Sequence, residues 1–95
     1  MPKGYVIARA VVTNATQWAV YAAAAGEAIK QYGGKPLVRG GQMTVAEGVG
    51  ASRNVVLEFE SFEQAKQYAV SAGYAAARTL REGAGTLDIV VVEGA

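Results

Sequence analysis

The sequence predicts an α+β fold of the ferredoxin-like type, an antiparallel sheet with both helices on one face. Three observations lead to this fold class. Strand-like and helix-like segments alternate in the order β-α-β-β-α-β, and right-handed crossovers place such helices together. Capping residues and glycines mark the ends of the helical segments. The first and last strand segments are apolar on both faces. The 95 residues suit one domain, residues 1–95.

Residues 5–12 form the first predicted strand. Every second residue from Val6 to Val12 is apolar, and Arg9 is the main polar residue on the other face. A strand of this kind is covered on both faces.

The first helix is predicted between Asn14 and the pair Gly33-Gly34. The Asn14 side chain can cap the helix, and Gln17 three residues on would complete a capping box. Glycine ends the helix because it accepts the left-handed conformation. Apolar residues recur at helical spacing at Trp18, Tyr21, Ala22, Ala25, Ile29 and Tyr32.

The second strand is predicted at residues 35–39, and Pro36 places it at a sheet edge because proline lacks a backbone donor. Gly40-Gly41 indicates a bend, after which residues 43–47 resume as a strand. Residues 53–60 form the third strand. Val55, Leu57 and Phe59 share one of its faces, and Asn54, Val56, Glu58 and Glu60 share the other.

A second helix is predicted after Ser61, with Gln64 completing another capping box. Residues 71–73 should break or kink it, and residues 74–81 continue as a helical segment. Residues 87–93 form the last strand.

Composition excludes several classes of function. The net charge is +1 and the charges are scattered, so neither nucleic acid nor an anionic membrane is an expected partner. No apolar run reaches the roughly 20 residues that a membrane span needs. The start leads directly into a strand-like run and not into a signal peptide, so we expect a cytoplasmic protein.

The apolar residues exceed what one sheet and its helices can hide. Hydrophobic residues make up 52% of the chain, and the helices can cover only one face of the sheet. A second copy of the same sheet is the simplest partner for the other face, because about 800 Å² per subunit forms a specific interface. We therefore expect a homodimer through the sheet face.

Several motifs, in order along the chain, resemble the small bacterial family called domain of unknown function thirteen-thirty, of the dimeric α/β-barrel superfamily. They are Lys3-Gly4-Tyr5-Val6-Ile7-Ala8, Tyr32-Gly33-Gly34, Leu37-Val38-Arg39-Gly40-Gly41, Glu47-Gly48, Arg53-Asn54-Val55-Val56, Glu58-Phe59 and Val92-Glu93-Gly94. The resemblance implies a homodimer whose sheets pack face to face. Superfamily relatives include cofactor-independent monooxygenases, isomerase-like enzymes and haem-handling enzymes, and the family itself has no settled activity.

The chain departs from the family pattern at two helix starts. Asn14-Ala15 stands where the family usually has Asp-Pro. Ser71-Ala72-Gly73-Tyr74 stands where it usually has Ser-Pro-Glu-Tyr, so a proline and a carboxylate near Tyr74 are lost.

Missing residue types limit the chemistry. The chain has no histidine and no cysteine, which removes histidine bases, thiolate nucleophiles and most zinc sites. Glu58 and Glu60 share a strand face, but two carboxylates without a third are a weak metal signal. We therefore expect no metal and no cofactor.

Arg39 is the leading ligand-binding candidate. It follows Leu37 on the same face of its strand, beside bare glycine backbone, and its guanidinium could hold a carboxylate, enolate or phosphate oxygen at two points. The alternative is an ion pair with Glu47 or Glu58 that fixes strand pairing or the dimer. Arg53 has the same two interpretations, and its place at a strand start favours a solvated side chain.

Tyrosines supply further candidates. Tyr21, at core spacing, is a packing residue or a hydrogen-bond donor to a ligand. Tyr74 and Arg78 lie four residues apart on one helix face, as a phenol beside a cation or as a stacked surface pair. Glu58 is a candidate general base if its strand face is desolvated. Glu63, Lys66 and Arg81 are interpreted as solvated residues.

Two functions fit these residues. One is a metal-free enzyme acting on a small carbonyl-containing or aromatic acid, in a pocket between the sheet and the helices. Arg39 would hold the anion there. The other is a small-ligand-binding or interaction module without turnover. An enclosed pocket of about 300–1,000 Å³ at these residues would separate them from a purely structural role.

Overall fold

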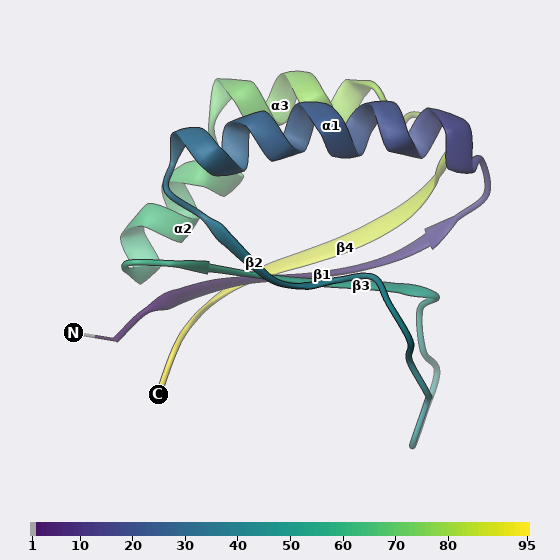
Figure 1. The fold of residues 1–95 in the computed structure, drawn as a ribbon, viewed down its shortest axis with the longest axis horizontal. Helices are drawn as coiled ribbons and strands as arrows, with labels where there is room; N and C mark the ends of the chain where they lie inside the picture. The colour runs from purple at the N-terminus through teal and green to yellow at the C-terminus, as the bar shows by residue number, and fades with distance from the viewer. Residues whose placement is uncertain (1) are drawn as a thin grey trace.

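The computed structural model describes residues 2–95 and has the predicted order of elements (Figure 1). They are β1 (Gly4–Val12), α1 (Ala15–Gln31), β2 (Lys35–Arg39), β3 (Arg53–Phe59), α2 (Phe62–Ala69), α3 (Ala72–Thr79) and β4 (Gly85–Glu93). The four strands are antiparallel in the order β2-β3-β1-β4. The helices lie over one face of the sheet, which confirms the α+β, ferredoxin-like class.

Asn14 caps α1 as expected, since its side chain accepts a hydrogen bond from the Gln17 backbone N–H at 3.1 Å. The second hydrogen bond of the predicted capping box, from the Gln17 side chain back to Asn14, is absent. The Gln17 side-chain amide donates instead to the carbonyls of Leu80 and Glu82, at 3.1 and 2.8 Å. Gln17 therefore ties the start of α1 to the segment that follows α3.

Ser61 caps α2 through the Gln64 N–H at 3.1 Å, and again the box is not reciprocal. The Gln64 side chain donates to the carbonyl of Tyr32, at the end of α1. The break before the last helical segment is present. α3 begins two residues earlier than predicted, because Ser71 caps it by accepting the Tyr74 N–H at 3.1 Å.

The strand predicted at residues 43–47 is wrong. Gly40 and Gly41 have positive φ values of 72° and 90°, and the chain turns away from the sheet there. Residues 41–50 run as an irregular loop on the side opposite the helices (Figure 1). β2 is an edge strand, so this segment finds no neighbouring strand with which to pair.

The hydrophobic core fills the space between the helices and the middle of the sheet. Val6, Phe59 and Tyr68 are its largest fully buried side chains, and the last two stack at 5.4 Å between ring centroids. α2 packs on β1, β3 and β4, whereas the main packing partner of α1 is α3. No helix among residues 2–95 is both long and apolar enough to cross a bilayer.

The sheet face opposite the helices carries an apolar stripe. Strand register aligns Val38 with Val56, Val56 with Ile7, and Ile7 with Val90, so the stripe crosses all four strands. Its two ends are open: Val38 is 42% exposed and Val90 is 50% exposed. No helix or strand among residues 2–95 covers this face (Figure 1), and the loop at residues 41–50 contacts it where Arg9 donates a hydrogen bond to the Val49 carbonyl.

Candidate functional site

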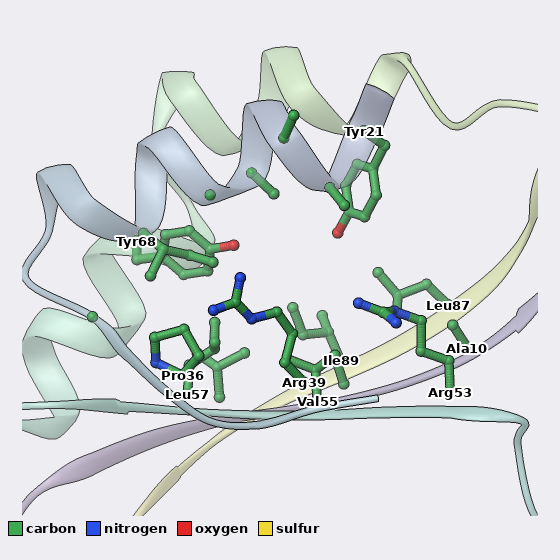
Figure 2. Close-up of a pocket in the computed structure, with 18 of the residues that line it drawn as sticks. Ala10, Tyr21, Pro36, Arg39, Arg53, Val55, Leu57, Tyr68, Leu87 and Ile89 are labelled. Atoms are coloured by element: carbon green, nitrogen blue, oxygen red, sulfur yellow. The ribbon is translucent and has the colours of Figure 1, made fainter. Parts of the chain in front are cut away.

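A cavity of about 360 Å³ lies between α1 and the helix-facing side of the sheet (Figure 2). Its floor is formed by apolar side chains from all four strands, and its roof by one side of α1. The floor residues are Val6, Ala8, Ala10, Pro36, Val55, Leu57, Leu87 and Ile89.

The cavity exists because part of its roof carries only small side chains. Ala22, Ala23, Ala25 and Gly26 lie over it, and a Cβ atom built on Gly26 would meet nothing within 4 Å. α1 continues through Gly26 as regular helix. The small side chains leave a space that a chain of larger residues would fill.

Strand register sets both arginines on the cavity face. Arg39 pairs with Val55, and Arg53 precedes Val55 by two residues, so the three share one face. β2 has a register irregularity between Pro36 and Val38. Regular alternation had predicted Arg39 on the same face as Leu37. The irregularity places it instead on the same face as Pro36. Figure 2 shows both guanidinium groups directed into the cavity.

Neither arginine forms the ion pair that sequence offered as the alternative. Within residues 2–95 the one ion pair joins Lys3 and Glu60, at 3.2 Å. The carboxylate among the residues lining the cavity is the exposed Glu27, on α1. Arg39 and Arg53 thus bring two positive charges to the cavity without a carboxylate at ion-pair distance.

Gly40 makes room for one of these charges. A Cβ atom at Gly40 would lie 2.7 Å from Nη1 of Arg53, so the bare backbone lets that guanidinium lie across the end of β2. The positive φ of 72° favours glycine at the same position.

Glu58 does not reach the cavity, so the structure corrects its interpretation as a base there. It alternates with Leu57 and Phe59 and lies on the opposite sheet face, where it accepts a hydrogen bond from the Tyr5 hydroxyl at 3.0 Å. This bond is the main reason that the pKa of Tyr5 is raised. The partner of Glu58 is therefore Tyr5 and not Arg39.

Tyr21 lines the cavity, while Tyr74 lies behind it, 2% exposed, with the two hydroxyls 3.0 Å apart. Burial, and then the Tyr74 hydrogen bond, raise the pKa of Tyr21. The expected pairing of Tyr74 with Arg78 is wrong, because Tyr74 is buried and Arg78 is exposed. The cation at these rings is Arg81, predicted as solvated: its Cζ lies 5.1 Å from the Tyr21 ring centroid and 5.9 Å from that of Trp18.

Tyr68 is the residue that sequence reasoning missed. It is 2% exposed and lines the cavity. Its hydroxyl points into that space (Figure 2). Among the described residues, the buried polar side-chain atom that lacks a hydrogen-bond partner is Nε of Arg81. Burial raises the pKa of Tyr68. A tyrosine at a core position, where phenylalanine would pack as well, was the available signal.

Residues 3–95 match the family model described as Domain of unknown function (DUF1330). The chain belongs to this family. No curated protein matches the sequence. Among the described residues, no cluster of three or more acidic side chains could hold a metal ion.

Solved structures share the fold at low sequence identity. RPA0582 of Rhodopseudomonas palustris, a protein of unknown function, aligns with a TM-score of 0.77 at 14% identity, covering 99% of this chain and 83% of its own. A dimeric ferredoxin-like protein of Thermobifida fusca, of unknown function, aligns with a TM-score of 0.61 at 16% sequence identity. The alignment covers 99% of this chain and 91% of that protein. A Caulobacter crescentus protein, described as a proposed antibiotic biosynthesis monooxygenase, aligns with a TM-score of 0.62 at 16% sequence identity. The alignment covers 99% of this chain and 91% of that protein.

Proposed function

We propose that the cavity between α1 and the sheet binds a small carbonyl-containing or aromatic carboxylic acid. The observation that carries the proposal is the pair of arginines, Arg39 and Arg53, directed into a largely apolar cavity without carboxylate partners. A guanidinium holds a carboxylate at two points, and such charge-assisted bonds strengthen where water is partly excluded. The apolar floor would take the body of the acid.

The size of the cavity fits this class of ligand. An engineered cavity of about 150 Å³ holds benzene. The 360 Å³ available here leaves room for one ring with a carboxylate and a further substituent.

Turnover of the same acid is the second candidate function. Glu27 supports it, because this α1 carboxylate lies at the cavity and could exchange a proton with a bound acid. The alternative is a module that binds the acid and leaves it unchanged. Proton NMR of a bound acid during prolonged incubation separates the two, since new resonances that depend on Glu27 require an enzyme.

The binding proposal is tested with benzoate as the probe. Trp18 is the one tryptophan of the chain and lines the cavity, so its fluorescence should change on binding, and calorimetry gives the affinity. Arg39→Gln or Arg53→Gln should weaken binding about tenfold to a hundredfold, since a hydrogen bond to a charged group contributes about 1.5–3 kcal/mol. Arg78→Gln, at an exposed site outside the cavity lining, is the control. Equal affinity in all the proteins would contradict the proposal.

We propose separately that the apolar stripe of the open sheet face joins two copies of this chain. Its exposed valines, and the dimeric state of the Thermobifida fusca relative, support this partner. Val90→Glu, in the stripe, should convert a dimer to a monomer in sedimentation velocity experiments. Val70→Glu is the control, since Val70 is 76% exposed at the end of α2. A wild-type monomer at high protein concentration would contradict the proposal.

A further inference from the structure

We infer that the acid bound in the cavity carries a second oxygen, phenolic or enolic, which accepts hydrogen bonds from Tyr68 and Tyr21. We also infer that Arg81 is a positioning residue for Tyr21. This inference rests on the proposed binding function and adds the ligand class. It follows from the polar groups on the helix side of the cavity, opposite the two arginines (Figure 2).

Tyr68 is the first of these groups. Its ring is stacked on Phe59 in the core, which fixes the direction of its hydroxyl. The Tyr68 hydroxyl opens into the cavity, where an acceptor on a bound molecule would lie within its reach.

Tyr21 is the second group. Its hydroxyl faces the cavity and lies 3.0 Å from the hydroxyl of Tyr74, which is buried behind it. Each hydroxyl has one proton to donate. If Tyr74 donates to the Tyr21 oxygen, the Tyr21 proton is free to point into the cavity.

Arg81 favours that orientation. It lies outside the cavity lining and faces the Tyr21 ring at 5.1 Å, and a guanidinium can only donate hydrogen bonds. A hydroxyl oxygen near Arg81 therefore acts as an acceptor toward it. Because Tyr74 is buried behind Tyr21, its proton has the Tyr21 oxygen as acceptor, which leaves the Tyr21 proton for the ligand.

Together these groups suit an oxygen that bears negative charge. Two phenolic donors with a cation behind one of them would stabilise a phenolate or enolate, as fixed dipoles do in oxyanion sites. The arginines approach from the sheet and the tyrosines from α1 and α2, so the acid would be held between these two sets of groups. The charged and titratable side chains that line the cavity are Tyr21, Glu27, Lys30, Arg39, Arg53 and Tyr68.

Calorimetry with benzoate and with 2-, 3- and 4-hydroxybenzoate tests the ligand class. At least one hydroxybenzoate should bind about tenfold or more tightly than benzoate. The favoured isomer shows which separation between carboxylate and hydroxyl matches the distance between the arginines and the tyrosine hydroxyls. Tyr68→Phe removes one oxygen and keeps the ring. It should reduce that advantage, with Tyr21 left as the remaining donor, while the affinity for benzoate changes less. Tyr5→Phe, on the opposite sheet face, should change neither affinity. If benzoate and all three isomers bind equally in an Arg39-dependent manner, the inference is overturned and the binding proposal stands. If none of them binds in an Arg39-dependent manner, both fail.

Absorbance of bound 4-hydroxy-3-nitrobenzoate tests the role of Arg81, because its phenol changes colour on ionisation. In the wild type the bound phenol should ionise at a lower pH than the free probe. Arg81→Met should move this ionisation back toward that of the free probe, and Arg81→Lys should retain part of the shift. An unchanged ionisation in Arg81→Met, or an equal loss of affinity for benzoate and the nitrophenol, would show a purely structural role and overturn this part.

Discussion

Gly26 offers a direct test of the open space beneath α1. Replacing it by alanine should stabilise the protein by about 0.8–1.0 kcal/mol, the difference in helix propensity between these residues. The added Cβ meets nothing within 4 Å, so no steric term opposes this gain. Each kcal/mol raises the melting temperature by roughly 4–8 °C in a domain of this size.

Gly26→Leu extends the test into the cavity. The three further carbon atoms would contribute at most about 2.4 kcal/mol if they were fully buried, at about 0.8 kcal/mol each, and less in a cavity that is partly open. Gly26→Leu should therefore be at least as stable as Gly26→Ala, while benzoate binding is lost because the space is filled.

Gly73→Leu is the matched control for Gly26→Leu. Gly73 is also helical, but a Cβ there would lie 3.4 Å from the Cβ of Ala28, where α3 packs on α1. Overpacking typically costs about 1–3 kcal/mol, so this variant should melt at a lower temperature than the wild type. Thermal unfolding followed by circular dichroism compares the proteins. If Gly26→Leu is destabilised as much as Gly73→Leu, the cavity is filled in solution and the reasoning is refuted.

Three further predictions concern stability. Gly4→Ala should destabilise the fold by about 1–3 kcal/mol or more in urea unfolding, because its Cβ would overlap the backbone carbonyl of Ser61; a wild-type midpoint would contradict this. Tyr21 and Tyr68 have raised pKa values in the folded state, so they stay protonated above pH 10 while the unfolded chain loses protons. Stability should then fall as pH rises above about 10, by at most about 1.4 kcal/mol per pH unit for each, and Tyr68→Phe should show a shallower decline. Gln17→Ala should cost about 1–2 kcal/mol, because two hydrogen bonds to the segment after α3 are lost, and an unchanged midpoint would count against that tie.

The fold could be predicted because local signals agree with one another. Asn14 and Ser61 cap helices as expected, and Pro36 lies on an edge strand. The strand predicted at residues 43–47 is absent. Strand-like residue types express only a preference, and a strand forms only where a neighbouring strand is available for pairing. The glutamine side chains were placed wrongly for a similar reason: long-range carbonyls competed with the local capping box.

The candidate site was less accessible to prediction. Arg39 and Tyr21 stood out by their chemistry, but the bulge in β2 that directs Arg39 to the cavity depends on pairing with β3. Arg81 was interpreted as solvated because the spacing of residues along its own segment does not show which side chains of another helix pack against it. In the structure it lies against Trp18 and Tyr21 of α1. The cavity itself arises from what is small, the alanines and Gly26 of α1, and a count of apolar residues cannot show that this space stays unfilled.

A crystal soaked in 4-bromobenzoate gives the most direct measurement of the central claim, that an aromatic acid binds between α1 and the sheet. The anomalous signal of bromine marks one end of the probe without interpretation of weak density. The account predicts a bromine peak inside the cavity, with the carboxylate at Arg39 and Arg53. A peak confined to the open sheet face, or no peak in the cavity at saturating probe, would contradict it.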